Sequence, residues 1–419
     1  MRAWQPLQIK DLGRVVTGKT PPTESLEYFD GDELFVSPKD LTRNSYYVES
    51  TATRISEKAL EKFKGQIIPR NAVMFTSLSF AFGKMGIASK SCITNQQINS
   101  VVVNTQHCSR FVYYLLRVYE PYIFAYNSGI DTPIVPKSVF EKIPVVVPNK
   151  DIQEKIAALL SAYDDRIANN QRRIGLLESM AEDIYREWFV RMRFPQHAGL
   201  KCDALLPADW IRRPIGELAD LIKRGISPDY DEKSENLVIN QKCIRRGRLS
   251  MVEARLHSTS IPDEKVLRDG DILINSTGVG TLGRSAVFDL DVDGITCDSH
   301  ITILRPKESA VMGEFLAYTI HLLQPYFESM ASGSTGQAEL SRELIGRTKV
   351  LVPTRSLLET FSAKVGPIRH QRRLLLEQNE KLILIRDQLL PRLISGKLSV
   401  DGIDIQYPPS MIAEQGQSA

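Results

Sequence analysis

The pattern of apolar positions predicts a long helix in the middle of the chain. Residues 151–189 contain no proline, and apolar side chains recur there at two positions of a seven-residue repeat. The first row is Ile156, Tyr163, Leu177 and Ile184, and the second is Leu160, Ile167, Ile174, Ala181 and Trp188. Such a sustained repeat is typical of a helix that packs lengthwise on another helix. With a rise of 1.5 Å per residue, a helix over residues 151–190 would be roughly 55–60 Å long.

Asn170 occupies the first row of this repeat. A buried asparagine at such a position sets the register between paired helices at some cost in stability. An asparagine on the exposed side of a bowed helix would have no such effect. The sequence leaves both interpretations open.

A second helix with the same repeat is predicted near the C-terminus. Its first row lies a constant 205 residues after that of the first helix and reads Phe361, Ile368, Leu375, Leu382 and Leu389. Three polar residues interrupt its second row: Arg372, Asn379 and Arg386. We expect this helix over residues 354–400, and Pro367 predicts a break or kink near its start. The pairing register of the two helices does not follow from the sequence.

The segments that precede the two helices also repeat each other. Each begins with a tryptophan, Trp4 or Trp210, followed by an amphipathic stretch and a Gly-x-Ser/Thr-Pro motif at 18–21 or 225–228. Further along, NAVMFTS corresponds to GDILINS, and FVYYLL corresponds to FLAYTI. The chain therefore reads as two copies of one unit, a globular part of roughly 150 residues followed by a long helix.

Each globular part is predicted to be α+β. Short segments bounded by Gly, Asn and Asp indicate strands of a curved, mostly antiparallel sheet, with one helix near 109–119 and again near 313–328. The expected boundaries, in chain order, are a first globular domain at 1–150, a helix at 151–190, a connector at 191–209, a second globular domain at 210–353, a helix at 354–400 and a disordered tail at 401–419.

Composition narrows the class of protein. Of the 419 residues, 42% are hydrophobic and 25% charged, which is enough to bury a core. No apolar run approaches the ~18 residues of a membrane span and no signal segment is evident, so we expect a cytoplasmic protein. Five cysteines without a C-x-x-C pair favour free thiols over a zinc site. With a net charge of only +3, any DNA-binding face must arise from local clustering.

Two glycine motifs match nucleotide-binding patterns but are predicted to serve other purposes. Residues 13–20 read GRVVTGKT and fit the phosphate-binding loop, yet Pro21 and Pro22 follow at once and prevent the helix that such a loop requires. Residues 278–283 read GVGTLG, but a strand is predicted after them in place of the helix of a dinucleotide site. We interpret the first as a strand-to-turn feature and the second as a glycine-rich hairpin loop.

Motifs that would indicate catalysis are missing from the sequence. The six histidines show no metal-ligand spacing, and no G-x-S-x-G elbow occurs. The Asp/Asn-Pro-Pro-Tyr/Phe motif of base-flipping methylation does not occur either. We therefore predict a non-catalytic protein with no metal and no cofactor of its own.

Two globular copies held apart by helices of fixed length suit a protein that reads DNA at two places. Successive major-groove faces lie ~34–36 Å apart along a duplex. Basic and amide side chains in Gly/Ser-rich loops can form paired hydrogen bonds with base edges. The candidates are Lys39, Arg43, Lys84, Asn95, Gln96 and Gln97 in the first copy, and Lys242, Arg245, Arg246, Arg248, Arg284, Ser299 and His300 in the second. The run at 244–249 can equally be a solvated hairpin tip, and Gln96-Gln97 the polar edge of a strand.

Several of these features occur together in one known family. They are the paired Gly-x-Ser/Thr-Pro motifs, the apolar strands that end at Pro148 and Pro353, Leu177-Glu178 leading to Trp188-Phe189, and Leu389-Leu390-Pro391 followed by Ser395-Gly396-Lys397-Leu398. In this order and duplication, which cover nearly the whole chain, they resemble the specificity subunits of type I DNA restriction–modification systems.

The resemblance implies an α+β fold of two duplicated target recognition domains separated by two long antiparallel coiled-coil helices, with pseudo-twofold symmetry. Each domain would read one half of a split double-stranded DNA target, and the helices would act as a ruler. Because the candidate loops differ between the copies, the target would be asymmetric. Two methyltransferase subunits, which bind S-adenosylmethionine, would dock on the duplicated surfaces, and restriction subunits can join them. This chain itself would do no chemistry.

Two other functions remain to be weighed against this one. A single-chain DNA-modification enzyme with a fused catalytic part is disfavoured because the catalytic motifs are missing. A helical scaffold protein without a DNA role would use the helix seams for assembly alone. DNA binding with a sequence preference, in the presence of a methyltransferase partner, would exclude the scaffold.

Overall fold

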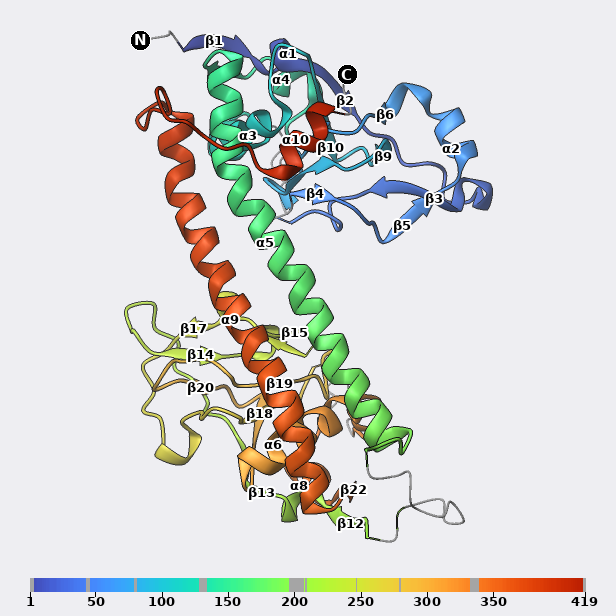
Figure 1. Ribbon diagram of the computed structural model, residues 1–419, viewed down its shortest axis with the longest axis vertical. Coiled ribbons are helices and arrows are strands. Elements are labelled where there is room, and N and C mark those ends of the chain that lie inside the picture. The colour runs from blue at the N-terminus through green and yellow to red at the C-terminus, as the bar shows by residue number, and fades with distance from the viewer. Residues whose placement is uncertain are drawn as a thin grey trace. The chain divides into compact units, whose positions relative to one another are not determined.

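The structure is a computed structural model that describes residues 4–42, 46–78, 81–127, 134–195, 207, 209–245, 247–278, 280–331 and 339–416. The chain divides into two compact units (Figure 1). Unit 1 comprises Met1–Asn169 and Gln378–Ala419, and unit 2 comprises Asn170–Glu377. Each unit therefore holds one globular domain and a part of both long helices.

The two long helices form where the apolar repeat predicts them. Helix α5 spans Lys150–Tyr185 and continues in a π-helical turn, Arg186–Val190, and helix α9 spans Arg355–Ile394 (Figure 1). The side chain of Asn149 accepts a hydrogen bond of 3.1 Å from the Ile152 amide and so caps the start of α5. None of the described helices is both long and apolar enough to cross a membrane.

Helix α9 continues through Pro367 without a break, so of the predicted break or kink the break does not occur. A proline inside a helix leaves the carbonyl four residues earlier without its partner amide. Here that carbonyl belongs to Ala363, and both Ala363 and Pro367 are exposed. Water can therefore hydrate the carbonyl, and the cost of the missing bond stays small.

In unit 1, α5 and α9 pack antiparallel against each other. Ile156 and Leu160 of α5 belong to the same core as Leu390 and Leu393 of α9. Next to them Arg386, one of the residues that interrupt the apolar row, forms an ion pair with Asp164. Both side chains are only 1% exposed, so this polar break in the seam is satisfied inside the core.

In unit 2 the same two helices meet through other residues. The rings of Trp188 and Phe361 lie 5.8 Å apart, and Arg372 Nε lies 3.7 Å from Glu178 Oε1. The residue numbers of the charged partners, 164 with 386 in unit 1 and 178 with 372 in unit 2, both add up to 550. The antiparallel register is therefore the same in each unit. Asn170 is 0% exposed, which excludes the exposed position on a bowed helix.

The globular domain of unit 1 is built on two sheets. The main sheet has the strand order β2 (Gly13–Thr17), β10 (Ile98–Val103), β7 (Val73–Thr76), β8 (Met85–Ala88) and β4 (Tyr47–Val48). The second has the order β5 (Thr53–Ile55), β3 (Phe29–Val36), β9 (Cys92–Thr94) and β6 (Ile67–Ile68), and β1 (Gln5–Gln8) pairs with β11 (Pro144–Val147). Its helices are α1 (Ile9–Leu12), α2 (Glu57–Lys62), α3 (Ser109–Ala125) and α4 (Lys137–Phe140).

The globular domain of unit 2 repeats this arrangement. Its main sheet has the order β13 (Ala219–Arg224), β21 (Ile301–Pro306), β18 (Ile272–Asn275) and β19 (Ser285–Val287). The smaller sheets are β17 (Arg255–Leu256) with β14 (Leu237–Ile239) and β20 (Thr296–Cys297), β15 (Ile244–Arg245) with β16 (Arg248–Leu249), and β12 (Ile211–Pro214) with β22 (Lys349–Val352). Its helices are α6 (Ser309–Leu322), α7 (Gln324–Met330) and α8 (Arg342–Arg347).

The two topologies share a common set of strands. The order β13-β21-β18-β19 matches β2-β10-β7-β8, and β17-β14-β20 matches β5-β3-β9. Most neighbouring strands run antiparallel, while β14–β20 and its counterpart β3–β9 are both parallel. The predicted duplication and the predicted α+β class are thereby confirmed.

The first half of α3 is enclosed in unit 1. In α3 all six residues from Phe111 to Leu116 are buried. A helix that is buried on every side needs packing partners on opposite faces. The partners of α3 are strands β7 and β8 of the main sheet and, on another face, α5, to which the Tyr114 hydroxyl donates a hydrogen bond at Asp164.

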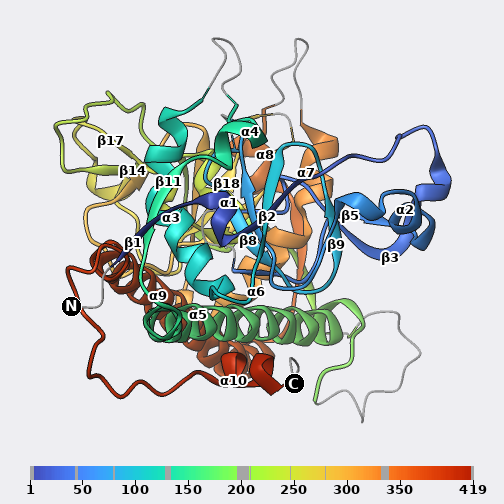
Figure 2. The ribbon, with the colours of Figure 1, turned by 90° about the horizontal axis from the view of Figure 1, so that it is seen from above.

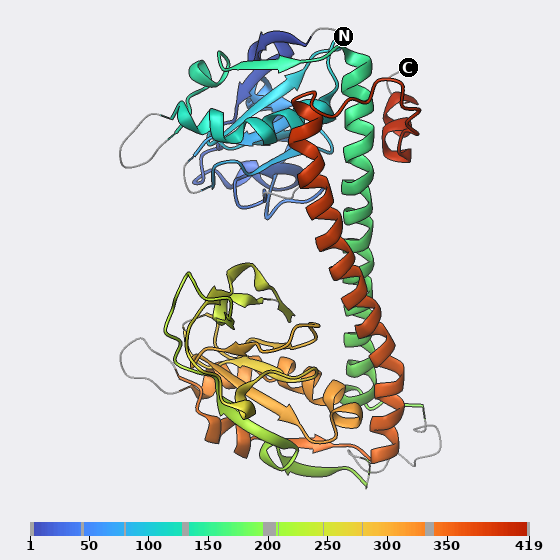
Figure 3. The same cartoon turned by 90° about the vertical axis from the view of Figure 1, so that its left-hand side faces the viewer.

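The segment after α9 is ordered as far as the structure describes it, so the predicted disordered tail at 401–419 is wrong there. A short helix, α10 (Pro409–Gly416), lies on the side of α5 away from the sheets of unit 1 (Figures 2 and 3). Ser410 Oγ accepts a bond of 2.9 Å from Arg110 Nη1 and donates one to Asp165. Met411 is 5% exposed within the core of unit 1. These contacts reach residues some 250–300 positions away, which local sequence patterns do not reveal.

Because Arg386 is the buried partner of Asp164, Arg386→Ala should lower the free energy of unfolding by about 3–5 kcal/mol. The loss arises from a carboxylate that stays buried without its countercharge. Urea denaturation of the full-length chain, followed by circular dichroism, measures it. Arg355→Ala is the matched control, since Arg355 and Glu308 are 63% and 58% exposed and their ion pair contributes at most about 1 kcal/mol. Equal destabilisation by the two variants would contradict the assigned role of the buried pair.

Candidate nucleic-acid interface

The glycine of the duplicated Gly-x-Ser/Thr-Pro motif lies directly against the backbone of a neighbouring segment, at one end of each main sheet. The Gly18 amide donates to the Ile98 carbonyl at 3.2 Å, and the Gly225 amide donates to the Ile301 carbonyl at 3.0 Å. A Cβ atom at Gly18 would lie 2.1 Å from the Thr94 carbonyl oxygen, and one at Gly225 would lie 2.0 Å from that of Cys297. Only glycine fits such a crossing, which explains why both copies carry it.

The loop that this glycine meets has the same turn in both copies. The side chain of Asn95 accepts a 3.0 Å bond from the Gln97 amide, and that of Asp298 accepts a 3.0 Å bond from the His300 amide. Asn95 therefore serves the turn itself as well as being a candidate contact. Burial raises the pKa of the Asp298 carboxyl, and the bond from the His300 amide opposes that rise.

Gln97 and His300 occupy equivalent positions. The carbonyl of Gln97 accepts a 2.9 Å bond from the Ser77 amide, and the carbonyl of His300 accepts one of 2.9 Å from the Ser276 amide. Both backbones are therefore held by the strand that ends beside them. The residue before each of them differs in exposure: Gln96 of the first copy is exposed, whereas Ser299 of the second copy is half-buried.

The basic candidates also form equivalent pairs. Lys84 and Arg284 each follow a hairpin turn, and their carbonyls accept bonds from the amides of Thr76 and Asn275, at 2.9 and 2.8 Å. Lys39 and Lys242 each lie three residues beyond the end of a strand. In the first copy that strand ends at Val36, whose carbonyl accepts a bond from the Asn95 amide. In the second copy it ends at Ile239, whose carbonyl accepts a bond from the Asp298 amide. The structure thus brings candidates from three separate loops to the same end of each main sheet.

Backbone carbonyls orient two of these cations. Lys84 Nζ donates to the Pro38 carbonyl at 3.3 Å, which places it beside Lys39. Arg284 Nη2 donates to the Gly280 carbonyl at 2.6 Å. Each keeps further N–H donors that these bonds do not use, so both remain able to contact phosphate or a base edge.

Ile244–Arg245 and Arg248–Leu249 pair antiparallel as a two-stranded hairpin, β15–β16, which fits either interpretation of this run. Arg248 lies on its second strand, and its guanidinium donates two hydrogen bonds to the Glu178 carboxylate of α5. That guanidinium therefore fastens the hairpin to α5. Arg245 is exposed, with its Nε bonded to the Lys242 carbonyl at 3.1 Å. Arg43 and Arg246 lie outside the described residues.

Three polar residues that the sequence analysis passed over belong to these clusters. Thr20 donates a 2.6 Å bond to the Gln96 side chain, and Thr277 bonds the His300 ring at 2.9 Å. Arg224 donates to the Ser299 carbonyl at 3.3 Å. Thr20 lies inside the duplicated glycine motif, which was a usable signal. Nothing local marks the other two, because their partners lie at least 23 residues away.

The two nucleotide-binding patterns have the structures that the sequence analysis favoured. Strand β2 ends at Thr17 and no helix begins at Lys19, whose ammonium lies 5.7 Å from the centre of the Phe63 ring. The glycines at 278 and 283 lie between β18 and β19, which pair antiparallel as a hairpin. Among the described residues, no group of His, Cys, Asp and Glu is arranged to hold a metal ion.

Comparisons with known proteins lead to one family. The model of the type I restriction modification DNA specificity domain matches residues 1–179. The MjaIX specificity subunit of a type I restriction enzyme from Methanocaldococcus jannaschii is 24% identical over 95% of this chain and 94% of its own length. The chain is similar to the specificity subunits of type I restriction–modification systems.

Further relatives extend the match over the whole chain. The MjaVIII specificity subunit of the same organism is 21% identical over 96% of this chain and 94% of its own length. A crystal structure of a type I specificity subunit from M. genitalium shares the fold, with a TM-score of 0.60 at 19% identity over 93% of this chain and 96% of that one. Both globular domains thus lie within the part that specificity subunits share.

Replacing the crossing glycine of unit 2 should disturb the loop that carries Ser299 and His300. We expect Gly225→Ala to lower the free energy of unfolding by about 1–3 kcal/mol, because its Cβ would overlap a backbone carbonyl that cannot move aside. Gly366→Ala is the matched control: no atom lies within 4 Å of its added Cβ, and alanine favours a helix by about 0.5–1 kcal/mol. Urea titrations compare the two. A stabilising Gly225→Ala would show that the crossing is not tight.

Proposed function

We propose that the chain confers DNA sequence specificity on a type I restriction–modification complex by reading a split target. The candidate residues at the end of each main sheet would read one half of it. Similarity to type I specificity subunits supports the general role in DNA recognition. The observation that carries the finer proposal is the positional equivalence of the candidates: Lys39 with Lys242, Lys84 with Arg284, and Gln97 with His300. Two frameworks that hold side chains at matching places are suited to reading two DNA segments in the same way.

The side chains at these matching places differ, which supports an asymmetric target. A glutamine side chain pairs best with adenine, and an arginine side chain pairs best with guanine. Unit 1 offers Gln96, Gln97 and Lys84, whereas unit 2 offers Ser299, His300 and Arg284. Since the hydrogen-bonding groups differ at equivalent points, the two halves of the target should differ in sequence.

Methyltransferase subunits are the partners that we infer for the long helices. Large apolar side chains remain exposed on them, namely Leu176 and Met180 of α5 in unit 2 and Leu384 and Ile385 of α9 in unit 1. Their exposed fractions are 66%, 52%, 58% and 43%. Neighbouring apolar residues on an exposed helix face are typical of a protein–protein interface. The partner would bind S-adenosylmethionine and modify adenine, and this chain would contribute no catalytic group.

Single-side-chain variants test the assignment of half-sites. The target is first mapped from the methylated adenines of a host that carries the intact operon. Gln97→Ala should then weaken binding to one half-site by ~1–3 kcal/mol, and His300→Ala should weaken binding to the other half by a similar amount. Competition binding with half-site-mutated duplexes, in the presence of the methyltransferase partner, measures both. Uniform weakening by either variant on every duplex would indicate a phosphate contact and contradict its role as a base reader.

Charge placed on the exposed apolar face tests the partner surface. Leu176→Asp combined with Met180→Asp should weaken association with a methyltransferase subunit at least tenfold, since carboxylates would be buried at the contact. Val252→Asp is the control, because Val252 is 88% exposed in unit 2 and does not lie on a long helix. Analytical ultracentrifugation of the purified subunits measures the association. Undiminished binding by the double variant would place the partner elsewhere.

A further inference from the structure

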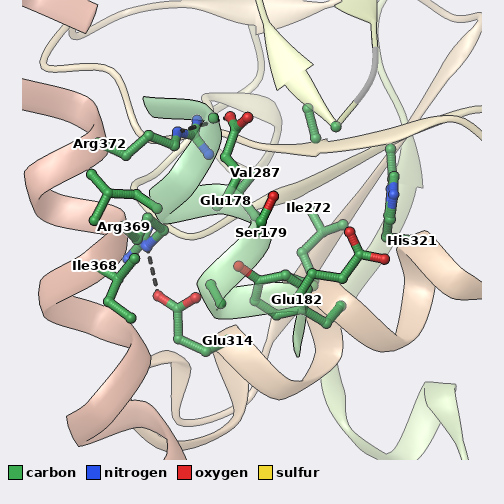
Figure 4. A pocket seen from close by; sticks show the side chains of 18 residues that line it. Glu178, Ser179, Glu182, Ile272, Val287, Glu314, His321, Ile368, Arg369 and Arg372 are labelled. Carbon is green, nitrogen blue, oxygen red and sulfur yellow. Dashed lines mark ion pairs between the residues drawn. The ribbon is translucent and has the colours of Figure 1, made fainter. Parts of the chain in front are cut away.

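Unit 2 encloses a cavity of about 400 Å³ between α5, α6, α9 and the strand β19 (Figure 4). Its size falls in the ~300–1,000 Å³ range of ligand-binding pockets. The walls of the cavity are apolar at Ala317, Ile272 and Val287 and polar at Glu182 and His321. Ser179, which also lines it, is exposed, so the cavity reaches the surface of the unit.

The cavity exists because unit 2 carries small residues where unit 1 carries large ones. Helix α6 repeats α3, and the match of FLAYTI with FVYYLL places Ala317 where unit 1 has Tyr113. In the sheet, Ile274 pairs with Ser285 as Phe75 pairs with Met85, so Ser285 stands where unit 1 has Met85. Tyr113 and Met85 are both 0% exposed. In unit 1 a phenol ring and a thioether thus fill the space that unit 2 leaves open.

Unit 1 also shows how a phenol is held at this place. The Tyr113 hydroxyl accepts a 3.1 Å hydrogen bond from Arg117 Nη1, and Arg117 Nη2 lies 3.7 Å from the Asp387 carboxylate. In the same alignment of α6 with α3, His321 stands at the position of Arg117. By the constant offset of 205 between the long helices, Glu182 replaces Asp387. The supporting polar groups therefore persist in unit 2, while the tyrosine that they would support does not.

Both of these groups line the cavity (Figure 4). Within the described part of the chain, no residue forms a hydrogen bond with the His321 ring, whose Cε1 would lie 3.5 Å from a Cβ at Gly247. The ring nitrogens are thus available to a ligand. A neutral imidazole can donate through one nitrogen and accept through the other.

The charges around the cavity are already paired, which argues for a neutral ligand. Arg369 Nε lies 2.6 Å from Glu314 Oε1, and Arg372 Nε lies 3.7 Å from Glu178 Oε1. Arg186 Nη2 lies 2.7 Å from Glu182 Oε1. Each of the three carboxylates has an arginine beside it, so none requires a cation from the ligand.

We propose that this cavity binds a phenolic ring, with the ring beside Ala317 and Ser285 and its hydroxyl hydrogen-bonded to His321. The ligand takes the place that Tyr113 occupies in unit 1. The phenol can belong to a free small molecule or to a tyrosine side chain of a partner, and the two sources share the same recognition chemistry. The cavity adjoins one candidate DNA contact, since Arg248 donates two hydrogen bonds to Glu178 of the lining, but binding of the phenol does not require DNA.

The test uses the full-length chain with p-cresol as the probe and toluene as its apolar counterpart. We expect saturable p-cresol binding in ligand-observed NMR, about tenfold tighter than that of toluene because of the hydrogen bond to His321. His321→Phe should remove the difference between the two probes. Ala317→Tyr should abolish binding of both, since the new ring fills the cavity. Val252→Tyr, which adds a tyrosine at an exposed position of unit 2, should leave binding unchanged.

The outcomes separate the proposal from a cavity that holds only water. No saturable binding by the unaltered chain, or equal binding by Ala317→Tyr, overturns it. If Ala317→Tyr does not fold, Ser285→Met takes its place, and the loss of the p-cresol preference in His321→Phe decides independently. N-acetyltyrosinamide distinguishes the sources: its binding indicates a partner's tyrosine, whereas binding of p-cresol alone indicates a free phenol.

Discussion

The buried ion pair between Asp164 and Arg386 is the interaction on which unit 1 depends. Asp164 of α5 receives both the Arg386 guanidinium of α9 and the Tyr114 hydroxyl of α3. One carboxylate thereby joins the two long helices and the enclosed helix of the globular domain. Inside a core such a group is stable only when all its partners are present. The position of the domain on its helices thus follows from satisfying one buried charge.

Unit 2 has its own ion pair between a long helix and the helix that corresponds to α3. The residue of α9 that corresponds to Asp164 is Arg369, and the residue of α6 that corresponds to Arg110 of α3 is Glu314. Arg369 and Glu314 form the ion pair of unit 2. Each globular domain is thus joined to its own segment of helix by a different pair of residues, Tyr114 with Asp164 in unit 1 and Glu314 with Arg369 in unit 2.

Divergence without loss of framework also describes the candidate DNA interface. The crossing glycines, the turn formed by Asn95 or Asp298, and the amide bonds from Ser77 and Ser276 recur in both copies. These elements fix the position of the backbone, and their geometry leaves no room for larger side chains. The side chains that they present differ between the copies. A constant backbone that carries different side chains is what the proposed reading of two different DNA segments requires.

Much of this architecture was visible in the sequence. What could not be predicted from the sequence has one cause. A heptad repeat indicates a helix and its buried face, because the repeat arises from that local geometry. A duplication is visible because equivalent positions recur at a constant offset. Arg248, by contrast, looked free for DNA and is bound to Glu178, 70 residues earlier. Its partner comes from the tertiary fold, and no local pattern carries that information.

The amino-acid sequence by itself determined the two helices, the twofold repeat and the turn glycines, since each depends on neighbouring residues or on comparing the copies. Only the tertiary structure decided that α9 passes through Pro367, that Ser410 fastens α10 to Arg110 and Asp165, and that unit 2 is hollow where Tyr113 fills unit 1. The reason is that hydration of a carbonyl, partnering of a charge and filling of a core depend on which distant segments meet in space.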